Sequence, residues 1–442
     1  MNAPLARRLA WSVRGFAGIV VSLLTSLAWA AAPTPQNQLA PQRMLIVAIA
    51  EKADPAPSVG STPRGYAGLP NYSGSSRSIA GAARLAHDYQ LHEVSAWTIN
   101  SLRLRCMLYE IPPAADRDEL LTRLRSDERV RLAQPLQSFD TLTTPSESGA
   151  TGAYNDPYVG LQRGFSAIGA DQAQRWSSGA GVRVALIDAG VDAAHPDLHE
   201  RIAAQRDFVD DPAAPAADDR HGTEVAGVIA AVANNRVGIA GVAPGARLYA
   251  YRACWSTQAG GSAARCNSFT LALALGAAID AGAQIINLSL GGPADPLLEQ
   301  LARHAVERGA ILVGAVPPSR RRDGFPLNVP GVIAVTDADE TPPGDGVLAA
   351  PGREILTLEP GGRYDYASGS SLAAAHVSGA IALLLQLNSR LSARDAFALL
   401  ESSAAGAAID VCSAATALRR SGEACRRAAL AAVPAREAPR NR

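Results

Sequence analysis

Three residues of the kinds that catalyse acyl transfer occur along the chain in the order Asp188, His221, Ser371. A carboxylate can orient an imidazole, the imidazole can take a proton, and the hydroxyl that gives up that proton can attack a carbonyl carbon. Taken singly, each residue has an ordinary structural interpretation: a turn former after a strand, a surface histidine and a helix-capping serine. Their combination therefore indicates catalysis only if the fold brings them together.

The sequence around each residue predicts where it lies. An apolar run over 182–188 predicts a buried strand that ends at its aspartate. His221 precedes a segment of small residues that predicts a helix over 223–233. Ser371 precedes an almost wholly apolar run, which predicts a helix buried on all sides. Free N–H groups at the start of such a helix can bind the oxyanion that forms when a hydroxyl attacks a carbonyl.

From about residue 155, predicted strands and helices alternate along the chain. This alternation predicts a parallel sheet with helices on both faces, and the ends of its strands gather functional residues at one edge. The chain order also excludes the α/β-hydrolases, in which the serine comes first. The predicted strands are 182–188, 246–253, 284–290, 310–316 and 331–336, and the predicted helices are 223–233, 269–281, 296–308 and the one that begins at 371.

The N-terminal third predicts export and a separate small domain. Arginines precede an apolar run over 18–27, which is followed by an A-x-A cleavage pattern, so residues 1–30 are predicted to be a secretory signal peptide. No later segment is predicted to span a membrane. The expected location is therefore secreted or periplasmic. We predict an α+β domain over 31–146 with a disordered insert at 53–78, a catalytic domain over 147–426 and a flexible tail over 427–442; the small domain has strands at 44–50, 102–109 and 130–135 and helices at 79–89 and 116–127.

Composition excludes several functions. The chain has 442 residues with 48% hydrophobic content, and its 41 Lys and Arg residues balance 41 Asp and Glu residues, so no nucleic-acid partner is expected. Lys52 is the only lysine, which excludes a Walker loop, a Schiff base and a Ser–Lys dyad. In an exported chain the cysteines can form disulfides. We expect Cys254–Cys266 and Cys412–Cys425, with Cys106 left over, although four cysteines allow three pairings.

Several motifs over 155–400 resemble those of the subtilisin-like serine peptidases, the subtilases. They are Asp188-Ala189-Gly190, His195-Pro196-Asp197-Leu198, His221-Gly222-Thr223, Gly241-Val242-Ala243-Pro244, Ser289-Leu290-Gly291 and Gly369-Ser370-Ser371.

The resemblance implies an endopeptidase fold and mechanism, with Asp188, His221 and Ser371 as the catalytic triad. It also implies that Ser289, Leu290 and Gly291 bind the substrate backbone, and that the substrates are polypeptides. The small domain looks like the family's propeptide, which assists folding and blocks the active site until it is removed. No cofactor is expected for the chemistry, and a monomer is expected.

One departure from the family pattern affects catalysis directly. Pro318 stands where the family carries an asparagine that donates a hydrogen bond to the oxyanion. Losing one such donor costs about 2.7–4 kcal/mol in the barrier, roughly a hundred- to a thousand-fold in rate. One hypothesis is that Ser319 or Arg320 supplies a substitute donor. The alternative is a weakened pseudo-protease that binds peptides; a non-enzymatic binding domain would leave the three motifs as coincidence. Four smaller departures, Ala189, Glu224, Leu372 and Ala375, are compatible with activity.

A structural calcium ion is a further expectation from the resemblance. Asp197 and the loop over 233–239, which includes Asn235, are similar to the calcium loop of many subtilases. A carboxylate, an amide oxygen and backbone carbonyls are ligands that suit Ca²⁺. An ordinary Asn-Asn-Arg turn is the alternative interpretation of this loop.

Overall fold

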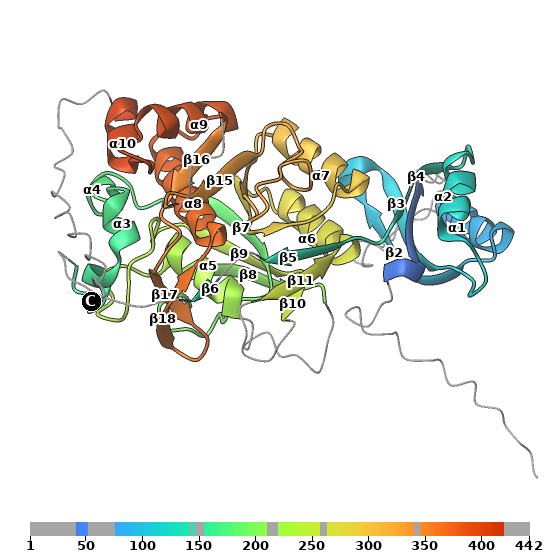
Figure 1. The fold of residues 1–442 in the computed structure, drawn as a ribbon, viewed down its shortest axis with the longest axis horizontal. Coiled ribbons are helices and arrows are strands. Elements are labelled where there is room, and N and C mark those ends of the chain that lie inside the picture. The colour runs from blue at the N-terminus through green and yellow to red at the C-terminus, as the bar shows by residue number, and fades with distance from the viewer. Residues whose placement is uncertain are drawn as a thin grey trace, which may run out of the picture. The chain divides into compact units, whose positions relative to one another are not determined.

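A parallel sheet of seven strands forms the centre of the catalytic part of the chain, in the order β16-β15-β14-β12-β7-β9-β8 (Figure 1). The structure is a computed structural model that describes residues 41–51, 76–141, 144–145, 154–209, 220–256, 263–339 and 345–419. These residues all belong to one compact unit. The strands of this sheet are β7 (Arg183–Asp188), β8 (Ile202–Asp207), β9 (Arg247–Arg252), β12 (Ile285–Leu288), β14 (Ile311–Ala315), β15 (Ile333–Asp337) and β16 (Val347–Ala350).

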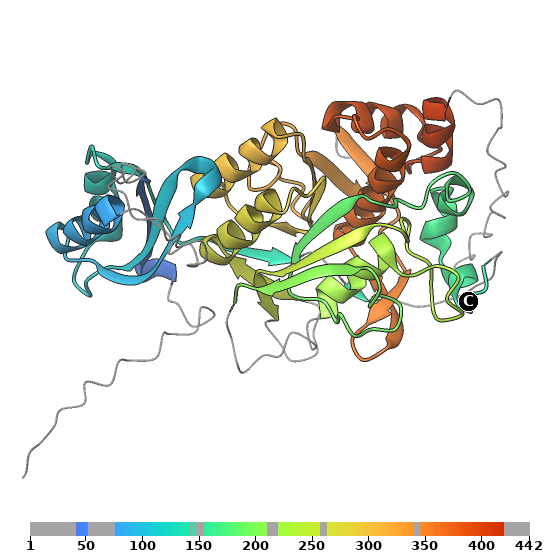
Figure 2. The same cartoon turned by 180° about the vertical axis from the view of Figure 1, so that it is seen from behind.

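Helices cover both faces of this sheet, as its continuous apolar strands require. Alternate residues of β7 point to opposite faces: Val184 and Leu186 pack with one cluster of helices, and Ala185 and Ile187 with another. The first cluster contains α5 (Arg220–Ala230) and α8 (Ser370–Leu387), and the second contains α6 (Ser268–Asp280) and α7 (Pro296–Glu307) (Figures 1 and 2). The predicted fold class, a parallel sheet between layers of helices, is confirmed.

The remaining elements of the catalytic part lie around this core. Among the described residues, α8 is the one helix long and apolar enough to span a membrane, and 83% of it is buried inside the protein, as expected of a core helix. These further elements are η4 (Val159–Leu161), α3 (Arg163–Ala167), α4 (Ala170–Ala173), β10 (Cys254–Ser256), β11 (Ala264–Asn267), β13 (Leu290–Gly291), β17 (Ile355–Glu359), β18 (Arg363–Ser368), α9 (Ala393–Ser402) and α10 (Val411–Arg419).

The small N-terminal domain is an antiparallel sheet in the order β2-β3-β1-β4 with two helices. Its predicted α+β composition agrees with this structure. The strand β2 was not predicted, because only half of its residues are apolar and most of them are only partly buried. The insert predicted over 53–78 is wrong at its end, since a helix begins at residue 76. The elements are η2 (Pro41–Arg43), β1 (Met44–Ala50), α1 (Ser76–Asp88), β2 (His92–Ile99), η3 (Asn100–Leu102), β3 (Leu104–Glu110), α2 (Arg117–Arg125) and β4 (Val130–Pro135).

Both faces of β1 are buried because two different layers cover it. Leu45 and Val47 pack against α1 and α2, whereas Ile46 and Ala48 belong to the apolar cluster of α6 and α7. The second face is therefore an interface with the catalytic part.

Specific contacts join the small domain to α6 and α7. The ring of Trp97 meets that of Phe269 edge-on, with centroids 4.7 Å apart. The side chain of Gln134 accepts a hydrogen bond of 2.9 Å from the backbone N–H of Leu297, in the first turn of α7. A polar residue from the small domain thus shares this N–H group with the capping side chain of Asp295, which accepts from it at 3.1 Å.

Several predictions concern residues outside the described part of the chain. These are the signal peptide at 1–30, most of the insert at 53–78, and the tail at 427–442. Cys425 also lies outside the described residues, so the pair Cys412–Cys425 stays a prediction.

Candidate active site

Asp188 and His221 form a short hydrogen bond at the edge of the central sheet. Asp188 is the last residue of β7, which lies between β9 and β12. The chain continues from β7 to β8 and β9 on one side of it and only then crosses to β12 on the other side. Its Oδ1 lies 2.6 Å from Nδ1 of His221, and both side chains are almost completely buried. The crevice at such a switch point is where open parallel sheets place their ligands.

Two glycines allow α5 to approach the turn after β7 this closely. A Cβ atom added to Gly222 would lie 2.0 Å from the carbonyl oxygen of Gly190, so only glycine fits there. Gly190 itself has a φ of 118°, a conformation that side chains rarely adopt. The glycines next to the two functional residues are therefore required by the geometry that joins them.

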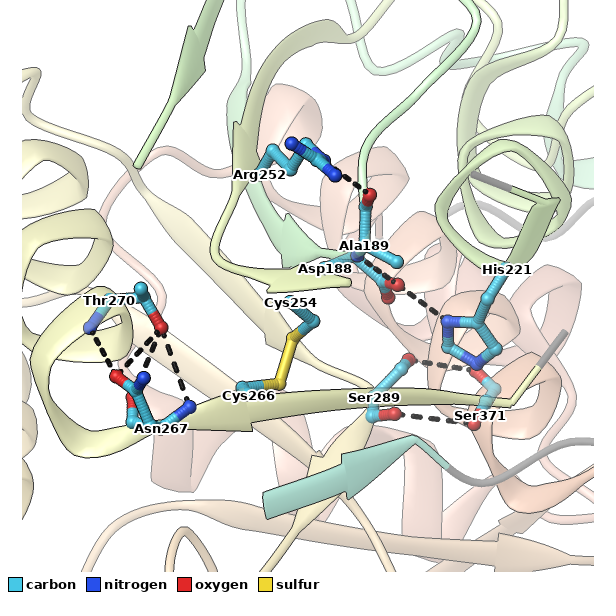
Figure 3. The surroundings of a disulfide bond; sticks show 10 residues. All are labelled: Asp188, Ala189, His221, Arg252, Cys254, Cys266, Asn267, Thr270, Ser289 and Ser371. Carbon is cyan, nitrogen blue, oxygen red and sulfur yellow. Dashed lines mark hydrogen bonds and ion pairs between the residues drawn. A yellow bond between two sulfur atoms is a disulfide. The ribbon is translucent and has the colours of Figure 1, made fainter. Parts of the chain in front are cut away.

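The environment of His221 favours its protonated form. Burial acts to lower the pKa of its imidazole, but the charge and hydrogen bond of Asp188 and the charge of Glu224 together outweigh burial, so the pKa is raised from 6.5. Nε2 of the ring has no hydrogen-bond partner among the described residues. In Figure 3 this edge of the ring points toward Ser371. The ring is thus positioned to exchange a proton on the side away from Asp188.

Ser371 lies in the first turn of α8, as the sequence predicted. Its hydroxyl donates a hydrogen bond of 3.3 Å to the backbone oxygen of Ser289, and the hydroxyl of Ser289 donates one of 3.1 Å to the backbone oxygen of Ser371 (Figure 3). Asn287 donates to the Ser289 hydroxyl at 2.8 Å and accepts from Ser378 at 2.8 Å. This network fixes the start of α8 to the segment from β12 to β13.

The strand β5 (Ser138–Thr141) lies between β11 and β13 and pairs with both in an antiparallel sense. Leu290 and Gly291, which were predicted to bind substrate backbone, pair here with Thr141 and Asp140. The predicted substrate-binding segment thus already holds a strand of the same chain. This pairing could not be predicted, because the two partners lie far apart along the chain.

A second short strand, β6 (Thr144–Pro145), pairs with the strand that precedes Ser371 in the chain. Its residues pair with Ala367 and Ser368 of β18, and β18 leads through Gly369 directly into α8. The segments on either side of residues 142–143 therefore pair with the strand before Ser371 and with the strand after Ser289. Two separate strand pairings, β5 with β13 and β6 with β18, thus lie next to the predicted nucleophile in the chain or through its hydrogen-bond partner Ser289.

Phe139 anchors β5. Its side chain is completely buried and meets the ring of Phe325 edge-on, with centroids 5.8 Å apart. A Cβ atom on Gly292 would lie 2.1 Å from the Phe139 ring, so this glycine makes room for it. Phe139 and Gly292 were both missed in the sequence as functional residues.

The disulfide Cys254–Cys266 joins β10 to β11, as predicted. Cys266 also stands opposite Phe139 in the pairing of β11 with β5. Figure 3 shows the disulfide beside the group formed by Asp188, His221 and Ser371. The covalent link therefore holds the strand that borders β5. Cys106 is a free, buried cysteine, as the predicted pairing left it.

Pro318 lies in a turn after β14 in which the N–H of Arg320 donates to the oxygen of Pro317 at 2.8 Å. Proline provides neither a side-chain donor nor an N–H. Ser319 lines a cavity of about 590 Å³ together with Gly291, Ala315, Pro317 and other residues, whereas Arg320 does not line it. Of the two substitute donors considered, Ser319 is therefore the one that lines the cavity beside the predicted substrate-binding segment.

The residues of the predicted calcium site do not fit a cation. Asp197 is fully buried, and its carboxylate accepts hydrogen bonds from Asn235 Nδ2 at 2.6 Å, from the N–H of Ile239 at 3.0 Å and from the Tyr364 hydroxyl at 3.1 Å. Asn235 turns its amide nitrogen to Asp197 because its oxygen accepts from the N–H of Val237 at 2.8 Å. Within the described ranges no three His, Cys, Asp or Glu side chains are grouped as metal ligands. Three protein donors therefore already satisfy the carboxylate that was expected to bind calcium.

Comparison with known proteins gives the class of this chain. The model of the subtilase family matches residues 179–426. Thermitase from Thermoactinomyces vulgaris is 35% identical over 241 residues, which are 52% of this chain and 84% of thermitase. A thermophilic serine proteinase from Bacillus sp. (strain AK1) is 35% identical over 272 residues, 59% of this chain and 64% of the relative. Subtilisin E from Bacillus subtilis (strain 168) is 37% identical over 223 residues, 47% and 56% of the two chains.

The chain therefore belongs to the subtilase family, a class of subtilisin-type serine endopeptidases. The matched region begins after the small domain, so the comparisons concern the central sheet and its helices.

Proposed function

We propose that this chain is the precursor of an exported serine endopeptidase whose triad is Asp188, His221 and Ser371. The observation that carries the proposal is the 2.6 Å contact between Asp188 and His221, whose other ring nitrogen faces Ser371. These are the relations that a carboxylate, a base and a nucleophile need. Membership of the subtilase family supports the same assignment.

The mechanism follows from this geometry. His221 takes the hydroxyl proton of Ser371 as the oxygen attacks the peptide carbonyl, and Asp188 stabilises the imidazolium that forms. The N–H of Ser371, at the start of α8, donates to the oxyanion. The imidazolium then gives its proton to the leaving amine, and water hydrolyses the acyl-enzyme with His221 again as the base. No step requires a cofactor.

We further propose that the small domain is a propeptide and that the chain cleaves itself between Thr141 and Thr144. The pairing of β5 with β13 and of β6 with β18 supports this, because an extended peptide bound across Ser371 would make the same kinds of backbone contacts. Ser289, Leu290 and Gly291 would bind the backbone of other polypeptide substrates in the same way after the propeptide leaves.

One experiment tests both proposals. The chain from residue 31 onward is produced beside Ser371→Ala, and intact masses, the new N-terminus and casein hydrolysis are followed over time. The wild type should be cut between Thr141 and Thr144 and hydrolyse casein, and the variant should stay full-length. A fluorophosphonate should label only the wild type. A wild-type chain that is neither cut nor labelled would refute the proposed triad.

The second candidate, a weakened pseudo-protease, is favoured by one observation: Pro318, in the turn after β14, has neither a side-chain donor nor an N–H. In the endopeptidase, Ser319 or Arg320 would have to replace the donor. The double variant Ser319→Ala/Arg320→Ala should then lose activity, and normal turnover in this variant would dispose of the substitution hypothesis. A labelled but inert wild-type enzyme would favour the pseudo-protease.

A further inference from the structure

Glu224 is a buried carboxylate on the helix of His221. It lies three residues after His221 on α5, a spacing that places two side chains on neighbouring parts of a helix surface. Its side chain is completely buried, and Oε2 has no hydrogen-bond partner among the described residues. A buried carboxylate is costly unless its charge is used or paired. The mechanism above does not use this group.

Arg220 links Glu224 to a second buried carboxylate. Its Nε lies 2.8 Å from Glu224 Oε1 and 2.6 Å from Glu359 Oε1, the last residue of β17. Its Nη2 lies 3.4 Å from the half-exposed Asp365 of β18. The Arg220 cluster, defined as Arg220, Glu224, Glu359 and Asp365, therefore has one positive charge for three carboxylates, and two of its members lie on the helix of His221.

We propose that Glu224 is a positioning residue of the triad, whose buried negative charge favours the protonated ring of His221 and so sets the pH at which the base becomes available. The inference rests on the proposed function of His221. Its physical basis is that opposite charges within a buried site interact much more strongly than in water. The charged groups facing Glu224 are Arg220 and His221 on α5, Asp188 on β7, Glu359 on β17, and Asp365 on β18.

The charges around His221 support this role. Burial and Asp188 have the largest effects on the pKa of the His221 imidazole. The negative charge of Glu224 has a smaller effect and raises this pKa. Burial raises the pKa of Glu224 itself, while His221 and Arg220 act in the opposite direction. Burial and the charge of Glu224 raise the pKa of Glu359 to about 7.

The test is the pH dependence of kcat/KM in the self-cleaved enzyme. Glu224→Gln removes the charge and keeps the shape, so the acidic limb should move to lower pH by roughly half a unit. At a given pH on the acidic limb, kcat/KM of the Glu224→Gln enzyme, expressed as a fraction of its plateau value, should then be about threefold higher than that of the wild type. Asp365→Asn removes an exposed carboxylate from the same arginine and should leave the limb in place. An unchanged limb in a Glu224→Gln enzyme of normal melting temperature would overturn the inference.

Two further measurements separate charge from packing and from activity. Glu224→Asp keeps the charge, so its limb should match the wild type; an equal shift in both variants would show a packing effect and refute the proposal. In the Ser371→Ala background, the titration of the His221 ring is followed by nuclear magnetic resonance, with and without Glu224→Gln. A lower pKa in the double variant is expected. This readout needs no turnover, so it can fail or succeed separately from the proposed endopeptidase function.

Discussion

At the scale of single residues, the hydrogen bond between Asp188 and His221 predicts a characteristic pH profile. The proposed mechanism needs the neutral ring of His221, and the pKa of that ring is raised above 6.5 in the folded protein. We therefore expect kcat/KM to rise with pH through a midpoint above 6.5. Asp188→Asn should lower kcat by about 10⁴-fold, because the ring loses its orienting partner. A midpoint below 6.5 in the wild type would contradict the assignment.

The same hydrogen bond also affects the stability of the folded protein. This contribution falls as the pH rises, whereas the expected activity increases. A histidine whose pKa is raised by folding stabilises the native state fully below the pKa of the unfolded chain, and this contribution disappears as the pH rises through the folded value. The pair is therefore expected to contribute least to stability at the alkaline pH where the base is fully available.

Pro318 gives the second residue-scale prediction. Restoring a donor with Pro318→Asn should raise kcat, by up to roughly a hundred-fold if no other group now performs this role. If Ser319 already serves as the donor, the gain should be less than tenfold. Steady-state hydrolysis of one peptide by both enzymes measures this. A matched change, Pro317→Asn, controls for the loss of a rigid ring in the same turn.

The functional residues divide into those that local sequence reveals and those that it does not. Asp188, His221 and Ser371 each stand at the end of a strand or the start of a helix, so the pattern around them fixes their place. Phe139 has no such pattern. It is one apolar residue in a short segment, and its role depends on Gly292, more than a hundred residues away. Only the pairing of distant strands brings these two together.

At the scale of elements, the cluster of Asp197, Asn235 and Tyr364 connects the loop after α5 to β18, which leads to Ser371. The carboxylate is buried and satisfied by protein donors, so chelation should not weaken the fold. We expect EDTA to leave the melting temperature unchanged. Tyr364→Phe should lower the free energy of unfolding by about 1–3 kcal/mol, since a buried acceptor loses a donor.

The control for this change is Tyr158→Phe. The ring centroids of Tyr158 and Tyr364 are 5.2 Å apart, but the side chain of Tyr158 is partly exposed. It should have a much smaller effect. A melting temperature that falls with EDTA and recovers with calcium would restore the calcium site that the hydrogen bonds of Asp197 argue against.

The disulfide Cys254–Cys266 gives a second prediction at this scale. It closes a loop with a sequence separation of 12, for which the chain-entropy estimate of its stabilisation is about 2–3 kcal/mol. In the proposed mature enzyme a substrate strand would take the place of β5 beside β11. Cys254→Ser/Cys266→Ser should therefore also raise KM more than it lowers kcat. The variant Cys106→Ala, which leaves the disulfide intact, serves as the control. An unchanged KM would mean that β11 does not need the covalent link to bind substrate.

Elements were easier to predict where one periodicity acts over many residues. Five of the seven parallel strands of the central sheet lie in apolar runs and were predicted, as were its helices, although α5 begins at Arg220 and not at residue 223. The edge strands β8 and β16 were not predicted; β8 is partly exposed and half polar. Short strands such as β5, β6 and β13 have two to four residues and no periodicity to detect. They exist because distant edges supply their hydrogen bonds, so they could be found only in the folded chain.

At the scale of the whole molecule, the small domain is held through two surfaces that differ in character. One face of its sheet packs on α6 and α7, and β5 extends from it into the candidate active site. Cutting the chain between Thr141 and Thr144 would leave both surfaces in place. The proposed propeptide should therefore remain bound after cleavage and delay the appearance of activity.

Phe139 should determine how long this delay lasts. Its ring is completely buried against Phe325, and truncating a buried phenylalanine costs about 3–5 kcal/mol. In a full-length chain carrying Phe139→Ala, self-cleavage should still occur, but the interval between cleavage and casein hydrolysis should shorten by at least about tenfold, since most of that cost falls on the bound state. Intact mass records the first event and hydrolysis the second. Ile79→Ala, an exposed change in the same domain, should leave the interval unchanged. An interval equal to that of the wild type in Phe139→Ala would mean that the interface on α6 and α7, and not the strand in the active site, controls release.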